Sequence, residues 1–191
     1  MELQFPQVKI FLAAGASYRL EDVRATFTRW IQQEALPELL IDVADYSHMH
    51  QGPGVVLVGH EANWSLDEGE GRPGLLYGVK QQRPGSARAV LIHVFRRVLE
   101  GCVLLETSLP GLRFDPRRAR VTLNDRLGGD GGEAAYRALE AELRSFLAVL
   151  HGPVPLRLDR ERDAKRRMAV EVAAELAAIP APNALLGKLA S

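Results

Sequence analysis

The sequence predicts an α/β (α+β) fold, in which a mixed or antiparallel sheet is layered with helices. Three segments, 20–36, 86–101 and 133–151, place apolar residues at the spacing of an amphipathic helix. About seven shorter segments carry the apolar runs or the strict alternation that are typical of β-strands. A chain of 191 residues with both kinds of element is long enough for one medium domain or two small, closely joined ones.

The predicted helices have recognisable ends. Glu21 and Asp22 lie in the first turn of the first helix, where the helix dipole favours negative charge, and Pro37 marks its end. Ser86 is a predicted N-cap of the second helix, and Gly101 is predicted to close it. These signals support helices over the segments that the apolar spacing indicates.

The predicted strands are of two kinds. The first kind is almost continuously apolar, which is typical of central strands covered on both faces. Its members are 8–13, 39–43, 55–58 and 103–105. The second kind alternates apolar and polar residues, which is typical of a sheet with one face in water. Its members are 121–124, 156–159 and 168–172.

The order of these elements predicts two units. Residues 1–108 follow the order β-α-β-β-α-β of a ferredoxin-like unit, with a short extra strand near 75–79. Residues 112–174 follow the order β-α-β-β and form a second unit packed on the first, and 175–191 form a C-terminal helix or tail. The alternative is one mixed sheet with helices on one side.

The composition is that of an ordinary globular protein and argues against several classes of function. The 24 Lys and Arg balance the 24 Asp and Glu, whereas a dedicated nucleic-acid binder needs a basic excess. No window of about 18 apolar residues predicts a membrane span, and the first residues do not resemble a signal peptide. The single cysteine cannot form an intramolecular disulfide, so we expect a cytoplasmic location. The preference for Arg over Lys is typical of a GC-rich bacterial genome.

The segment 42–67 is the first candidate site, because it contains three of the five histidines. It predicts a hairpin with a loop of about nine residues, which is longer than usual, and long loops often carry function. His48 and His50 lie on one side of an extended segment, and His60 or Glu61 could add a third ligand. Such a set would suit a divalent metal such as zinc or non-haem iron.

The alternative interpretation of the histidines is structural. By alternation, His60 shares an apolar face with Val58 and Trp64, so it would lie in or beside the core as a neutral, hydrogen-bonded side chain. The loop that carries His48 and His50 would then be a solvated connection.

A second candidate site in the same region is a small-molecule site. Its candidate anchors are Asp42, Asp45, Tyr46, Trp64 and Tyr77. Asp42 interrupts an apolar run that is predicted to be a central strand, so its carboxylate must be hydrogen-bonded, paired or shifted in pKa. Its structural explanation is an ion pair with one of the many arginines, and Asp45 could instead assist the metal site.

No segment matches a highly specific catalytic motif, so we predict a non-catalytic binding or assembly module that self-associates or binds a protein partner. The two-sidedly apolar strands of the first half support a homo-oligomer, and Leu185, Leu186 and Leu189 could dock on the body or on a partner. The alternatives are a metal-dependent enzyme or metal-binding protein that uses the hairpin of His48, His50 and His60, and a small-molecule-binding sensor.

Overall fold

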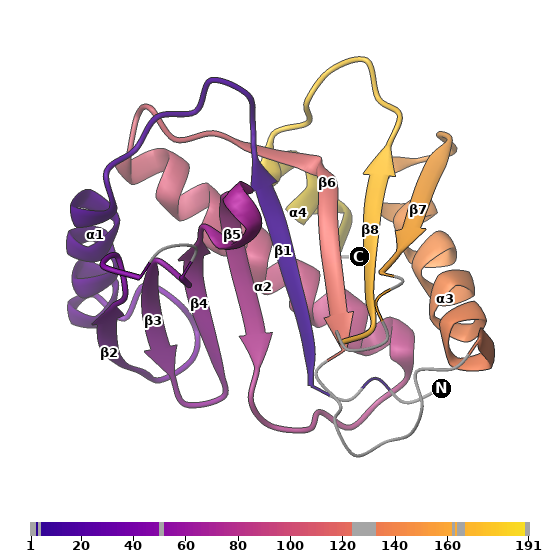
Figure 1. The fold of residues 1–191 in the computed structure, drawn as a ribbon, viewed down its shortest axis with the longest axis horizontal. Coiled ribbons are helices and arrows are strands. Elements are labelled where there is room, and N and C mark those ends of the chain that lie inside the picture. Colours follow the sequence, from indigo (N-terminus) through magenta and orange to yellow (C-terminus); the bar gives the residue numbers. More distant parts are fainter. Residues whose placement is uncertain are drawn as a thin grey trace.

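Eight strands in the described part of the chain form one antiparallel sheet, in the order β2-β3-β4-β5-β1-β6-β8-β7 (Figure 1). The computed structural model describes residues 3, 5–49, 52–123, 133–161, 163 and 167–189. The strands are β1 Pro6–Leu12, β2 Leu40–Asp45, β3 Val55–Gly59, β4 Ala62–Asp67, β5 Gly74–Val79, β6 Phe114–Leu123, β7 Leu156–Arg160 and β8 Ala169–Ala174. The helices are α1 Leu20–Gln32, α2 Ala87–Ser108, α3 Glu133–His151 and α4 Pro182–Leu189, and the short 3₁₀ turn η1 spans Gly69–Gly71.

The helices cover one face of the sheet and leave the other face uncovered (Figure 1). On β1, Val8 and Ile10 are buried in the core, while Lys9 between them points to the opposite face. On the neighbouring strand β6, Val121 pairs with Val8 and Arg120 pairs with Lys9. The core therefore lies between sheet and helices, and the centre of the uncovered face carries charged residues. The turn η1 lies over this uncovered face (Figure 1).

The three predicted helices are present, but α1 ends at Gln32, before the predicted end at Pro37, because Glu34 adopts a left-handed backbone conformation with φ of 49°. In α1 the buried stripe consists of Val23, Phe27 and Trp30, and the ring centroids of the two aromatic residues are 5.1 Å apart. The hydroxyl of Ser86 accepts a hydrogen bond from the backbone amide of Ala89, so Ser86 is the N-cap of α2 as predicted.

The predicted strand 103–105 is wrong, because α2 continues as one helix to Ser108. Gly101 does not end this helix but lies within it. A Cβ atom there would lie 2.8 Å from Leu75 Cδ2 and 3.4 Å from the indole of Trp64. The glycine lets α2 approach β4 and β5 closely, so an apparent helix-end signal is instead a packing requirement.

The strand order does not confirm the ferredoxin-like arrangement. Strands β2 to β5 form an antiparallel meander in which each strand pairs with the next. Strand β1 then pairs with both β5 and β6, so the sheet is continuous across the predicted boundary near residue 110. The coarser prediction, a mixed α and β protein with an antiparallel sheet layered with helices, is confirmed.

The C-terminal helix α4 docks on the body of the same chain. Leu185 and Leu189 are buried in the core, and α4 packs against α2 and α3. Lys188 Nζ donates a hydrogen bond to the carbonyl oxygen of Leu150 at 3.0 Å, and Arg96 donates one to that of Leu189. Leu185 and Leu189 are therefore buried by contacts within the same chain.

Among the helices of the described residues, none has the length and hydropathy that a membrane span requires.

Candidate functional site

The structure places His48 and His60, two of the predicted metal ligands, at opposite ends of β3. His48 is an exposed residue of the loop between β2 and β3, and His60 lies in the turn between β3 and β4. His50 lies outside the described residues. Glu61 pairs with Arg83 at 2.8 Å. Among the described residues, no group of three or more His, Cys, Asp or Glu side chains could hold a metal ion.

The prediction that His60 lies in or beside the core is wrong, because His60 is exposed. The chain reverses at Gly59–Glu61, and Trp64 pairs with Leu57 rather than with Val58, so Val58 and Trp64 lie on opposite faces and no single alternation joins His60 to both. Gln81 Nε2 lies 3.4 Å from Nε2 of His60 and is its polar neighbour.

The predicted anchors on β2 lie at the edge of the sheet rather than in a central strand. Asp42 Oδ1 accepts a hydrogen bond from the amide of Val43 at 2.7 Å, and the Asp42 side chain is exposed. Asp45 accepts one from the amide of Ser47 at 2.9 Å, and hydrogen bonds from Ser47 hold the pKa of Asp45 below its usual range. Tyr46 is 39% exposed. Since β2 is an edge strand, Asp42 reaches water and needs no buried partner.

The structure does bring Trp64 and Tyr77 together, beneath the helix α2. Their ring centroids are 4.7 Å apart, and Tyr77 Oη lies 3.3 Å from His93 Nε2. Burial and the charges of Arg83 and Arg97 lower the pKa of His93 to about 4, so this imidazole is neutral near pH 7. Burial also raises the pKa of Tyr77 above its ordinary value.

Sequence reasoning missed the most perturbed carboxyl group of this region, Glu38, which precedes β2. Both of its carboxylate oxygens are buried, and neither has a hydrogen-bond partner of good geometry among the described residues. The carboxyl carbon packs against the β3–β4 turn, 3.4 Å from where a Cβ of Gly59 would lie. Burial, and then the negative charge of Glu61, raise the pKa of Glu38 to about 7, against the lowering effects of Arg97 and of the turn amides.

We name these side chains the Glu38 cluster. It consists of Glu38, Glu61, Tyr77, Arg83, His93 and Arg97. No sequence signal marks Glu38, because it stands in an ordinary loop before a strand and its neighbours come from distant segments. Clusters of perturbed titratable groups are frequent at functional sites, although ion-pair networks also produce them.

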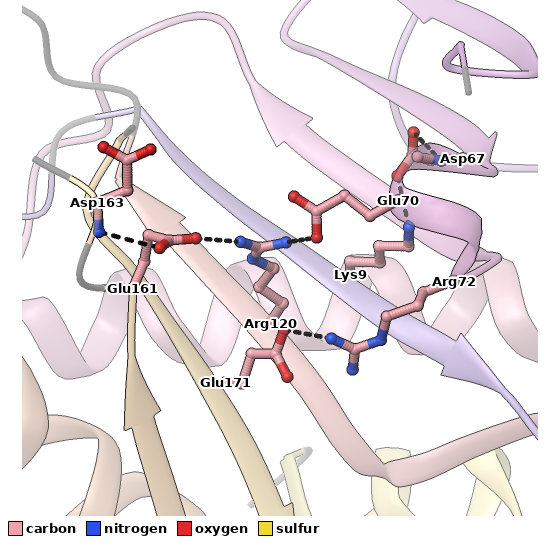
Figure 2. A network of polar contacts seen from close by, with 9 residues as sticks. Lys9, Asp67, Glu70, Arg72, Arg120, Glu161, Asp163 and Glu171 are labelled. Carbon is pink, nitrogen blue, oxygen red and sulfur yellow. Dashed lines mark hydrogen bonds and ion pairs between the residues drawn. The ribbon is translucent and has the colours of Figure 1, made fainter. Parts of the chain in front are cut away.

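A second polar region, an ionic network, lies on the uncovered face of the sheet (Figure 2). It ties the β4–β5 connection to β1, β6 and the β7–β8 hairpin. The ion pairs are Lys9–Asp67 at 2.5 Å, Arg72–Glu171 at 2.5 Å, Arg120–Glu70 at 2.8 Å and Arg120–Glu161 at 3.2 Å. Each of these cations is paired with a carboxylate, so the network explains how the β4–β5 connection is held on the sheet.

Within this network, Lys9 is almost fully buried, and burial lowers its pKa despite the counter-charge of Asp67. The ring of Phe11, also buried, has the guanidinium of Arg72 at 4.2 Å and that of Arg118 at 5.7 Å from its centroid. The desolvated lysine and the flanked ring both indicate a packed structural layer rather than an open catalytic centre.

A third feature is apolar and exposed. Four of the six large exposed apolar residues in the described chain lie on β2 or beside it, and we name them the apolar edge. They are Leu39, Ile41, Tyr46 and Met49. Their gathering at one edge of the sheet distinguishes this surface from isolated exposed side chains, which need no explanation.

The comparisons with known proteins supply no family. No protein-family model matches this chain. No curated protein gives a significant match to it either.

Proposed function

We propose that the chain is a non-catalytic assembly module that self-associates through the apolar edge. The observation that carries the proposal is that two residues of the apolar edge, two positions apart in the chain, are exposed: Leu39 is 67% exposed and Ile41 is 53% exposed. Exposed apolar side chains that gather on one part of a folded chain are typical of an interaction site. Val56 and Val58, half-buried on β3, extend the apolar character inward from β2.

Association by simple strand addition is disfavoured at this edge. The register of β2 against β3 shifts between Leu40 and Asp42, as at a β-bulge. In addition, the carboxylate of Asp42 accepts a hydrogen bond from the amide of Val43. Bulges and charged residues are the usual protection of edge strands against pairing with other sheets. We therefore expect the interface to form between apolar side chains rather than by extension of the sheet.

A second copy of the chain is the proposed partner. The formal net charge is zero, so two copies experience no net long-range repulsion. In a two-fold dimer the same edge meets itself, and Leu39 and Ile41 contribute from both copies. Burying such partly exposed side chains stabilises a dimer by about 1–2 kcal/mol each, which supports a weak association on the order of micromolar affinity or weaker.

The test compares matched variants by size-exclusion chromatography with light scattering. We expect Ile41→Asp to weaken self-association by at least about tenfold, because a charge would be buried in the interface. The matched control is Ile179→Asp, an exposed apolar residue (44%) outside the apolar edge, which should associate like the wild type. Equal association of all three proteins, or a monomeric wild type that binds only a different protein, would contradict the proposal.

A further inference from the structure

The start of β2 is held against the β3–β4 turn by two contacts. The carbonyl oxygen of Leu39 accepts a hydrogen bond from the amide of His60 at 2.8 Å. Next to this bond, the carboxyl group of Glu38 packs against Gly59, with both oxygens shielded from solvent. A Cβ at Gly59 would also lie 2.6 Å from the carbonyl oxygen of Ala62, so the turn has no room for larger residues.

The groups that act on Glu38 come from the surrounding elements. Glu61 in the turn, Tyr77 on β5 and Arg97 on α2 interact with Glu38 electrostatically. Around these groups, Arg83 pairs with Glu61, His93 lies beside Tyr77, Lys80 contacts Gly59 of the turn, and His60 follows Gly59 in the chain. The cations are engaged: Arg83 pairs with Glu61, Arg97 with Glu100 at 2.7 Å, and Lys80 donates to the carbonyl oxygen of Gly59. A neutral carboxyl group fits this buried position, whereas an ionised one would lie buried near Glu61 without a good hydrogen bond.

We infer that Glu38 regulates the proposed self-association: its neutral form holds the start of β2 against the turn, and its ionised form releases it. This inference rests on the proposed function, because Leu39 and Ile41 of the apolar edge directly follow Glu38 in the chain. Ionisation draws the carboxylate towards water and loosens the bond between Leu39 and His60. The apolar edge then loses its fixed geometry, and association weakens as the pH rises through neutrality.

The release is tested by hydrogen exchange on monomeric protein, corrected for the intrinsic effect of pH on the exchange rate. We expect the protection of the His60 amide to fall about tenfold between about pH 6 and about pH 8. Glu38→Gln keeps the shape but cannot ionise, so its protection should change by less than about twofold. The variant also retains His60 and His93, which separates the effect of Glu38 from that of the nearby imidazoles. Glu175→Gln, an exposed control, should behave like the wild type.

A second variant keeps the inference testable if Glu38→Gln fails to fold. Glu61→Gln removes the negative charge that helps to raise the pKa of Glu38, so the midpoint of the loss of protection should move to lower pH. Protection that is independent of pH in the wild type, or an unchanged midpoint in Glu61→Gln, would overturn the inference.

Light scattering on the same proteins separates this inference from the proposed function. A dimer that weakens from about pH 6 to about pH 8 in the wild type but not in Glu38→Gln supports both. A dimer that is indifferent to pH overturns the regulation and leaves the proposed function intact. A monomer at every pH overturns the proposed function, and the hydrogen-exchange result then decides whether Glu38 releases β2.

Discussion

The ion pair between Lys9 and Asp67 provides the most quantitative test of the uncovered face. The side chain of Lys9 is 7% exposed and that of Asp67 is 20% exposed, so water can solvate an unpaired Asp67 more easily than an unpaired Lys9. Asp67→Asn leaves the Lys9 ammonium buried near Arg72 and Arg120 without its counter-charge, which we expect to cost about 2–3 kcal/mol. Lys9→Met leaves a carboxylate that still reaches water and accepts from the Gly69 amide at 3.3 Å, so its cost should be about 1 kcal/mol.

The double variant distinguishes pairing from two independent effects. When both charges are removed, no buried charge remains, and the methionine stem packs in place of the lysine stem. We therefore expect the double variant to cost about 1 kcal/mol, well below the sum of the single costs, with a coupling energy of about 2–3 kcal/mol.

Urea unfolding with a constant m value measures these costs directly. For a chain of this length, 1 kcal/mol corresponds to about 2–4 °C in Tm, so Asp67→Asn should melt about 4–12 °C below the wild type. Equal costs for the two single variants, with simple additivity in the double variant, would refute the reasoning that burial makes the pair asymmetric.

Three further predictions concern stability. The raised pKa of Glu38 contributes stability that is fully present below about pH 4.5 and is lost as the pH rises through about 7. Glu38→Gln should therefore raise the free energy of unfolding at pH 8 by about 1–2 kcal/mol, a value reduced for solvent screening. A urea midpoint at pH 8 no higher than that of the wild type would contradict this. Burial and the charge of Lys188 lower the pKa of His151 to about 4, so the free energy of unfolding should fall by about 2–3 kcal/mol from pH 6.5 to pH 4. In His151→Gln this contribution to the fall should be absent. A pH profile of Tm that is the same in the variant and the wild type would show that the imidazole is not neutral and buried. Gly101→Ala should lower the free energy of unfolding by about 1–2 kcal/mol, because the new methyl group meets Leu75. Gly187→Ala in α4 adds a methyl group in open space and should raise it by about 0.5–1 kcal/mol. The opposite order of the two Tm values would contradict the packing explanation.

The helices and the coarse fold could be predicted because their causes are local. The stripe of Phe27 and Trp30, and the cap at Ser86, depend on residues a few positions apart. The strand predicted at 103–105 failed because a short apolar run has the same appearance in a buried helix and in a buried strand. Gly101 added to this error, since a glycine needed for close packing resembles one that ends a helix.

The sites depend on contacts between distant segments, which local patterns do not specify. Trp64 and Tyr77 could be named as candidates because aromatic residues in strands are conspicuous, and the structure brings them together. Glu38 could not be identified, since its perturbation comes from the turn at Glu61 and from Arg97 on α2. Asp42 was conspicuous in the apolar run but lies on an edge strand, and sequence order alone does not reveal which strand is at the edge.

Sedimentation equilibrium of the unmodified protein tests the central claim, self-association through the apolar edge, most directly. The chain has a mass of 21.0 kDa, so a dimer is readily separated from a monomer. We predict a reversible monomer–dimer equilibrium at about pH 6, with an apparent mass that rises with protein concentration towards twice that value. A single species at the monomer mass over concentrations up to the order of 1 mM would contradict the account.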